Sequence, residues 1–314
     1  MDQIRIVFLG TSAGLPSRQR NVASVAVILD GQVLLFDCGE GTQQQLLRSS
    51  VRTGAIEAIF ITHLHGDHLY GLPGLLASAS LSGREAPLAV YGPPGLRDYL
   101  ANVIRTTHVG FTYEMEMFEI DRDEVRRGDG YRIVAAPLDH TTLCFGFAVI
   151  EDDRPGTFNI DRARELAIPP GPLYGRLQRG EDVIVGDRTI RSSDVVGPRR
   201  SGRRIVYCTD TRPCRRAVDL ARGADILIHE ATYMGDLARE ASERGHATAE
   251  DAAGIAADAG VGRLILTHIS PRYLDVEPLV TEARRVFART DAAEDFMEIP
   301  IHHREHREHG EKPL

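Results

Sequence analysis

The sequence contains almost no lysine. Of its 37 lysine and arginine residues only Lys312 is a lysine, and the formal net charge of the 314-residue chain is −8. An acidic chain lacks the uniform positive charge with which many nucleic-acid-binding proteins hold phosphates. The excess of arginine over lysine is typical of a GC-rich genome and by itself says little about RNA.

Long apolar runs are also missing. No segment approaches the roughly 18 apolar residues of a membrane-spanning helix, and the chain begins directly with a strand-like segment, MDQIRIVFLG, without a signal-peptide pattern. We therefore expect a cytoplasmic protein without a membrane segment. The hydrophobic content of 42% is enough for a core in one large domain or two modest ones.

The four cysteines are too scattered to form a recognisable framework. Cys38, Cys144, Cys208 and Cys214 lie far apart and form no CxxC pair, which argues against a disulfide framework and against a thiolate zinc site. We expect buried, reduced cysteines, so any metal would be held by histidine and carboxylate.

Positive charge is concentrated in one segment. Residues 154–204 contain 11 arginines against 6 acidic residues, a local excess of +5, so the rest of the chain carries −13. Within this region, residues 152–186 include RPGTFNIDRARELAIPPGPLYGRLQRG, whose prolines and glycines make it a poor continuation of a core. We predict a projecting arm there; an ordinary solvated loop or a dimer contact are the alternatives.

Strands and helices alternate in both halves of the chain, which is typical of a layered α/β protein. The predicted strands are Ile4–Gly10, Ser24–Asp30, Val33–Asp37, Ala58–Thr62, Leu88–Tyr91, Ile205–Thr209, Ile226–His229 and Leu264–Thr267. The predicted helices are Gly41–Ser50, Leu69–Ser80, Pro94–Thr107, Arg215–Arg222 and Ala249–Ala259. We expect a single catalytic domain over residues 1–301. Residues 302–314 are predicted to be a polar, disordered tail, although its four histidines leave metal binding as an alternative.

The segment ITHLHGDH is the most informative motif. It places His63, His65, Asp67 and His68 directly after an apolar strand. Three imidazoles and a carboxylate within six residues have little structural use, because each would need its own hydrogen-bond partners when buried. Metal binding removes that cost, so we interpret the motif as ligands for two neighbouring ions.

Three more polar residues close apolar strands. His140 ends YRIVAAPLDH, Asp210 ends RRIVYCTD and His268 ends RLILTH. Each alone fits a strand-end cap equally well. Together with the first motif they supply seven ligands, enough for two zinc ions if one carboxylate bridges them. Two Zn²⁺ ions with two aspartates leave a charge of about +2, which suits an anionic phosphodiester.

These seven residues, in this order, resemble the metallo-β-lactamase superfamily over most of the chain. The resemblance implies an α/β (α+β) protein built as a four-layer αββα sandwich. It implies that His63, His65 and His140 hold one Zn²⁺, and that Asp67, His68 and His268 hold a second, with Asp210 bridging. Mn²⁺ remains an alternative to zinc. Lactamases, glyoxalase II enzymes, phosphodiesterases and nucleases all use variants of this motif, so it does not choose a substrate.

Three further features resemble the ribonuclease Z family. FLGTSAGLPSRQRNVAS is similar to its amino-terminal signature, IHEATY with GHATAEDAA resembles its paired HEAT and HST elements, and IPPGPLYGRLQRG resembles its flexible tRNA-binding arm. Ala247 stands where the second element has serine. The resemblance implies substrate contacts by Pro16, Arg18, Arg20, Asn21, Pro170, Gly171, Pro172, Arg176 and Arg179. A local cap for Glu230 and a position before a helix for His246 are the structural alternatives.

The resemblance implies a zinc-dependent endoribonuclease, in most cases a homodimer, that cuts precursor tRNA after the discriminator nucleotide. The products would be a tRNA 3′-hydroxyl and a 5′-phosphorylated trailer. Asp67 would orient the attacking water and accept its proton, and His246, polarised by Glu230, would protonate the leaving oxygen. A small-molecule phosphodiesterase of the same fold is the alternative; it would have no need of the arm.

Overall fold

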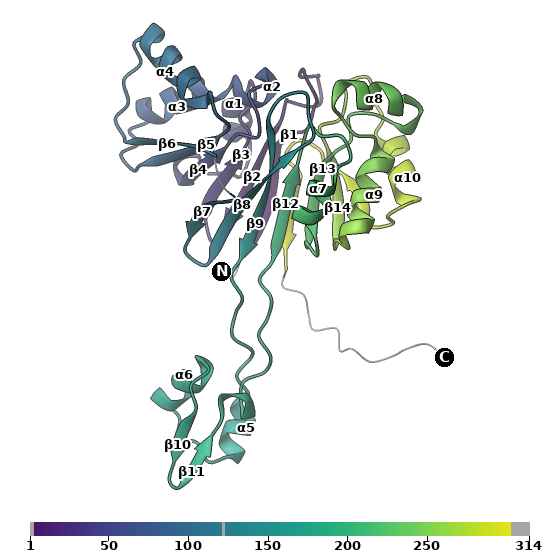
Figure 1. Cartoon of the computed structure of the whole chain (residues 1–314). Coiled ribbons are helices and arrows are strands. Elements are labelled where there is room, and N and C mark those ends of the chain that lie inside the picture. Colours follow the sequence, from purple (N-terminus) through teal and green to yellow (C-terminus); the bar gives the residue numbers. More distant parts are fainter. Residues whose placement is uncertain (1–2, 121–122, 303–314) are drawn as a thin grey trace. The chain divides into compact units, whose positions relative to one another are not determined.

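The computed structural model describes residues 3–120 and 123–302 (Figure 1). The chain divides into two compact units. We call residues 151–203 the insertion, and the described residues up to Ile150 and from Arg204 the body. Among the described residues, no helix has the length and apolar character needed to cross a membrane. Apart from His302, the predicted tail lies outside the described residues.

Within the described residues the body contains two seven-stranded sheets. The first has the spatial order β16 (Glu298–Ile301), β1 (Ile4–Gly10), β2 (Ser24–Leu29), β3 (Gln32–Phe36), β4 (Ile56–Phe60), β5 (Leu88–Gly92) and β6 (Met115–Glu119). Strands β3 to β6 run parallel, whereas β16, β1, β2 and β3 are paired antiparallel. The carboxyl ends of β3 and β4 therefore meet at one edge of the sheet.

The second sheet has the spatial order β15 (Thr290–Ala292), β14 (Arg263–Thr267), β13 (Ile226–Glu230), β12 (Arg204–Cys208), β9 (Cys144–Glu151), β8 (Tyr131–Leu138) and β7 (Glu124–Gly128). Strands β12 to β15 are parallel, and β9 pairs antiparallel with β12. The carboxyl ends of β12, β13 and β14 thus also share an edge, which brings residues from three distant segments together.

The two sheets pack face to face, with helices on both outer faces (Figure 1). Aromatic rings fill the space between them; Phe36 and Phe60 stack with centroids 5.1 Å apart, and Phe147 meets Phe60 edge-on. The first sheet is covered by α1 (Thr42–Arg48), α3 (Leu72–Leu81) and α4 (Leu96–Thr107), and the second by α7 (Arg215–Ala221), α9 (Ala249–Ala259) and α10 (Glu277–Arg284). This arrangement confirms the predicted αββα sandwich.

Local sequence determines some elements completely. Strand β1 and helix α9 have the predicted bounds. The first turn of α9 is capped by Thr248, whose hydroxyl accepts from the N–H of Asp251, while the Asp251 carboxylate accepts from the N–H of Thr248. The helix ends at Gly260, which adopts a φ of 62°. Such a capping box with a terminal glycine needs only neighbouring residues.

The helix predicted over Leu69–Ser80 is wrong at its start. The structure has two helices here, α2 (Gly66–Leu69) and α3 (Leu72–Leu81). Gly71, between them, donates its N–H to the carbonyl of Cys38, and a Cβ on Gly71 would lie 2.0 Å from the carbonyl oxygen of Gly39. This close approach to a distant backbone segment separates the helices, and α2 carries Asp67 and His68.

The insertion is longer than the predicted 152–186. It contains α5 (Ile160–Glu165), α6 (Pro172–Gln178), β10 (Val183–Val185), β11 (Arg188–Ile190) and a 3₁₀ helix, Ser192–Asp194. Its small core is built from Ala163, Ile168, Leu177, Val183, Ile190 and Val195. Because Ile190 and Val195 complete that core, the unit extends to Arg203, where the Arg203 guanidinium donates to the Glu151 carboxylate at 2.8 Å.

Candidate metal centre

The site residues follow strand ends. Asp210 comes two residues after β12 and His268 directly after β14. Both adopt left-handed backbone conformations, with φ of 50° and 51°. This conformation is unfavourable for residues other than glycine, and strain of this kind is held only where the surrounding packing enforces it. The strained turns direct both side chains toward the other site residues at the carboxyl ends of the parallel strands.

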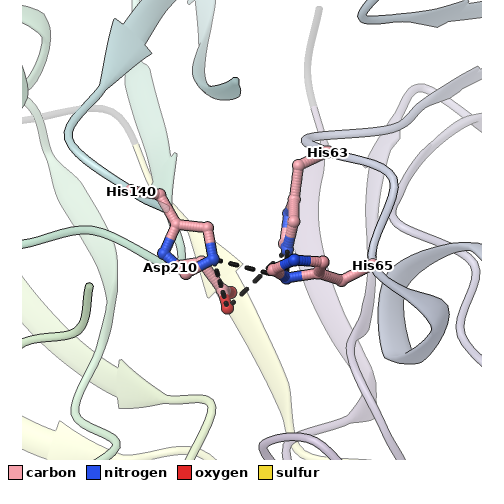
Figure 2. Close-up of side chains that lie close together, drawn as sticks. All are labelled: His63, His65, His140 and Asp210. Atoms are coloured by element: carbon pink, nitrogen blue, oxygen red, sulfur yellow. Dashed lines mark hydrogen bonds and ion pairs between the residues drawn. The ribbon is translucent and has the colours of Figure 1, made fainter. Parts of the chain in front are cut away.

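Figure 2 shows His63, His65, His140 and Asp210 turned toward a common point. One potential ligand atom from each lies within 4.8 Å of the others. Nε2 of His63 is 3.0 Å from Nδ1 of His65, which is 3.3 Å from Nε2 of His140. Three imidazole nitrogens and a carboxylate gathered in this way form a donor set suited to zinc or a related transition metal.

A second group contains Asp67, His68 and His268, again with ligand atoms within 4.8 Å of one another. Nε2 of His68 lies 3.3 Å from Oδ2 of Asp67 and 3.3 Å from Nε2 of His268. Asp210 joins the groups, because its Oδ1 is 3.8 Å from Nε2 of His63 while its Oδ2 is 3.2 Å from Nε2 of His68. One carboxylate thus faces both donor sets.

Two imidazoles of the first group, those of His63 and His140, are held from behind through Nδ1. The Nδ1 of His140 is 2.8 Å from the carbonyl oxygen of Gly245, and the Nδ1 of His63 is 3.0 Å from Oγ1 of Thr62. Such contacts fix the ring and its tautomer, so that Nε2 points inward. Gly245 has a φ of 81°, and a Cβ there would lie 2.8 Å from Nδ1 of His140, so only glycine fits.

Burial and neighbouring rings bring His63 and Asp210 to the protonation states that a metal requires. Burial and the neighbouring His68 hold the pKa of the fully buried His63 well below its usual value. For Asp210, burial opposes ionisation, but the facing rings of His268, His68 and His63 keep its pKa well below normal. A neutral imidazole and an ionised carboxylate are the forms that bind metal.

We call the seven residues of the two groups the His/Asp cluster, and beside it lies a His–Glu pair. Nδ1 of His246 is 3.0 Å from Oε1 of the buried Glu230, which also accepts the N–H of Thr211 at 2.7 Å. Burial opposes protonation of His246, yet the Glu230 carboxylate raises the pKa of His246 to about 9. The His246 side chain is 16% exposed, and its Nδ1 is 3.8 Å from Oδ1 of Asp210. The pair can therefore hold a proton at the edge of the cluster.

Asp37 is a site residue that is not among those predicted from the sequence. It is fully buried, has a φ of 57°, and its Oδ2 lies 2.8 Å from Nδ1 of His68. The same oxygen accepts the Tyr207 hydroxyl at 3.0 Å, and Oδ1 accepts the N–H of Thr62 at 2.8 Å. The detectable sign was a carboxylate closing the apolar segment VLLFD, the same pattern that singled out Asp210.

The amino-terminal loop contacts the centre directly. The N–H of Gly14 donates to Oδ2 of Asp67 at 2.9 Å. Arg20, expected to contact substrate, donates from Nη1 to Oγ1 of Thr11 at 2.7 Å and to the carbonyl of Ala293 at 2.6 Å. Its guanidinium is thus engaged in holding the loop.

Other expected contact residues differ in their surroundings. Asn21 donates its side-chain amide to the carbonyl of Glu40 at 2.8 Å, whereas Pro16 and Arg18 are exposed. In the insertion the exposed candidates are Pro170, Gly171, Pro172, Arg176 and Arg179. Arg176 and Arg179 both pair with the Glu181 carboxylate, at 2.9 and 3.1 Å. Exposed ion pairs of this kind are weak, so phosphates can compete for the two cations.

The chain is similar to known proteins along nearly its whole length. Residues 4–111 match the family described as Anti-Pycsar protein Apyc1, and residues 180–269 match the Beta-lactamase superfamily domain. A ribonuclease Z of Gloeothece citriformis is 47% identical over 96% of this chain and 98% of its own length. A ribonuclease Z of Methanosarcina acetivorans is 42% identical over 96% and 99%. The crystal structure of human tRNase Z, short form, superposes with a TM-score of 0.66 at 31% identity, covering 94% of this chain and 98% of that one.

Proposed function

The chain belongs to the ribonuclease Z family of the metallo-β-lactamase superfamily, and from this premise we propose that it is a tRNA 3′-processing endoribonuclease. It cleaves precursor tRNA after the discriminator nucleotide, leaving a 3′-hydroxyl on the tRNA and a 5′-phosphate on the trailer. The observation that carries the proposal is the complete His/Asp cluster with the Glu230–His246 pair beside it, in a chain that aligns with ribonuclease Z over 96% of its length.

The two donor groups fit two divalent cations. His63, His65 and His140 would hold the first, Asp67, His68 and His268 the second, and Asp210 both; the two oxygens of Asp210, each facing one group, support this assignment. Two cations bound there would lower the pKa of a shared water molecule toward neutrality and offset the charge of the phosphodiester. The imidazole-rich set favours Zn²⁺ over Mn²⁺.

Protons are handled by residues of the chain. Asp67, held by the Gly14 N–H at 2.9 Å, would orient the attacking water and take its proton as the new oxygen–phosphorus bond forms. The bond from phosphorus to the ribose 3′ oxygen then breaks, and that oxygen receives a proton from His246. Glu230, which accepts from Nδ1 of His246, leaves Nε2 of that ring free to act as the donor.

Recognition of tRNA is assigned to two exposed regions. Pro16 and Arg18 lie on the loop whose Gly14 contacts Asp67, so they are suited to contact nucleotides next to the cut. Arg176 and Arg179, with the exposed turn Pro170–Pro172, are suited to hold backbone phosphates elsewhere on the tRNA. If the tRNA is recognised through its phosphates and shape, the distance from these contacts to the metal centre sets the position of the cut, whatever the nucleotide sequence.

Removal of the insertion should separate the two roles. Replacing residues 152–202 by a short glycine-containing turn joins Glu151 to Arg203, since Ile150 and Arg204 are opposite each other in the β9–β12 pairing. A shorter deletion ending at Arg179 would leave Val183, Ile190 and Val195 without their core partners. We expect the variant to lose cleavage of a labelled, CCA-less precursor tRNA by about a hundredfold or more, the equivalent of about 3 kcal/mol.

The same variant should hydrolyse bis(p-nitrophenyl) phosphate at the wild-type rate within about twofold, because all seven cluster residues belong to the body. Thermal unfolding of both proteins controls for the fold. A wild type that hydrolyses only the small diester would favour the small-molecule phosphodiesterase and refute the tRNA function. Undiminished tRNA cleavage by the variant would refute the role of the insertion.

We also assign a homodimer in which the insertion of one subunit serves the active site of the other; family membership supports this assignment. Co-expression of insertion-deleted chains with Asp210→Ala chains, purified through two different tags, tests it. The mixed dimer is expected to recover about half of the wild-type tRNA cleavage, because one complete combination remains per dimer. Sedimentation of the wild type as a monomer, or an inactive mixed dimer, would contradict the assignment.

A further inference from the structure

Thr232 lies between the His/Asp cluster and the His–Glu pair. It follows β13, its side chain is buried, and its Oγ1 is 2.6 Å from Oε2 of Glu230 and 3.0 Å from Nδ1 of His268. The same oxygen is 3.1 Å from the carbonyl oxygen of His268 and 3.5 Å from Nδ1 of His246. One hydroxyl therefore contacts both halves of the site.

A threonine hydroxyl has a single proton to donate. The shortest contact, and the only charged acceptor, is the Glu230 carboxylate, so the proton lies on that side. The oxygen lone pairs then face Nδ1 of His268 and accept its N–H. A proton on Nδ1 leaves the Nε2 lone pair of His268 directed at the cluster, 3.4 Å from Oδ2 of Asp210.

Thr232 also anchors one oxygen of Glu230. Oε1 is held by the N–H of Thr211 at 2.7 Å and by His246 at 3.0 Å. Oε2 is held by the Thr232 hydroxyl at 2.6 Å and, more loosely, by the Thr232 N–H at 3.3 Å. Without the hydroxyl, Oε2 keeps only the long contact, and a buried carboxylate that loses a donor rotates to find another.

We propose that Thr232 is a positioning residue that couples the two halves of the site, fixing the tautomer of His268 for metal binding and the orientation of Glu230 for His246. The proposal rests on the proposed function only for the identity of the substrate. Contacts of this kind behind a metal ligand contribute about 10- to 100-fold to metal affinity or activity. Loss of the one hydroxyl should therefore lower zinc affinity and turnover together.

Two substitutions separate the hydroxyl from the methyl group. Thr232→Val keeps the shape and removes the hydroxyl, and Thr232→Ser keeps the hydroxyl and removes the methyl. Zinc affinity is measured by competition against a fluorescent chelator with no substrate present. The valine variant is expected to bind Zn²⁺ about 10- to 100-fold more weakly than wild type. Serine should recover most of the affinity.

Kinetics on the zinc-loaded proteins give the second readout. For Thr232→Val we expect kcat for bis(p-nitrophenyl) phosphate and for precursor tRNA to fall, again by about 10- to 100-fold, with KM for the tRNA little changed. Wild-type affinity and kcat in the valine variant would overturn the proposal. An equal loss in the serine variant would also overturn it, because packing of the methyl group would then be the cause.

The zinc titration is independent of tRNA. If the wild type fails to cut precursor tRNA while the valine variant loses zinc affinity and diester hydrolysis, the proposed function fails and the role of Thr232 stands. If the wild type cuts tRNA and the valine variant behaves as wild type, the role of Thr232 fails and the proposed function stands.

Discussion

Asp210→Ala is expected to lower hydrolysis of both precursor tRNA and bis(p-nitrophenyl) phosphate by at least about a thousandfold, corresponding to several kcal/mol of lost transition-state stabilisation. The carboxylate is buried and contacts both donor groups, with Oδ1 3.8 Å from His63 and Oδ2 3.2 Å from His68. Its loss leaves imidazoles of both groups facing one another without the shared anion. Purified protein should also contain less zinc, as measured by mass spectrometry.

Asp219→Ala is the matched control for this substitution. Asp219 is an exposed aspartate of α7 that pairs with Arg215 of the same helix and with Arg222 directly after it. Exposed pairs of this kind contribute little, so both activities should stay within about twofold of wild type. An Asp210→Ala protein that melts like wild type yet retains zinc and turnover would show that the bridging role is wrong.

His246→Ala is expected to separate the two substrates. Cleavage of precursor tRNA should fall by about 10²- to 10⁴-fold, the usual contribution of a general acid, because the ribose 3′ oxygen needs a proton as it leaves. Hydrolysis of bis(p-nitrophenyl) phosphate should fall far less, since p-nitrophenolate leaves as a stabilised anion. Glu230→Gln should weaken tRNA cleavage in the same direction, because it removes the charge that keeps His246 protonated.

His108→Asn is the control for the loss of an imidazole. His108 is exposed at the end of α4 with a φ of 55°, a conformation that asparagine tolerates. Its replacement should leave the rates of cleavage of both substrates unchanged. If His246→Ala lowers cleavage of precursor tRNA and hydrolysis of the small diester equally, the proton-donor role is contradicted, and the ring supports the His/Asp cluster instead.

Elements whose causes are local were predictable from the sequence. Strand β1 and helix α9 have the expected bounds, because apolar alternation and the Thr248–Asp251 capping box act within a few residues. Elements that depend on distant packing were not. The predicted helix from Leu69 is split by the contact of Gly71 with Gly39, and strand β16 exists through its pairing with β1, where Ile301 opposes Ile4.

The seven cluster residues were predictable because each is a polar side chain that closes an apolar strand or follows one within a short motif. The contacts that support them were not. Asp37 and Tyr207 are 170 positions apart in the sequence but share a hydrogen bond behind His68. The family resemblance predicts a substrate contact for Arg20, and only the positions of Thr11 and Ala293 reveal that its guanidinium also holds the loop.

Periodicity, motif spacing and local composition were enough to predict the alternating strands and helices, the polar residues that gather in the His/Asp cluster, and an arginine-rich insertion, because these features are properties of the chain. The tertiary structure decided which atom of each side chain faces the cluster. It also decided that Asp210 faces both donor groups and that the insertion ends at Arg203. Hydrogen-bond geometry and close backbone packing join residues far apart in sequence, and such contacts exist only once the two sheets have packed together.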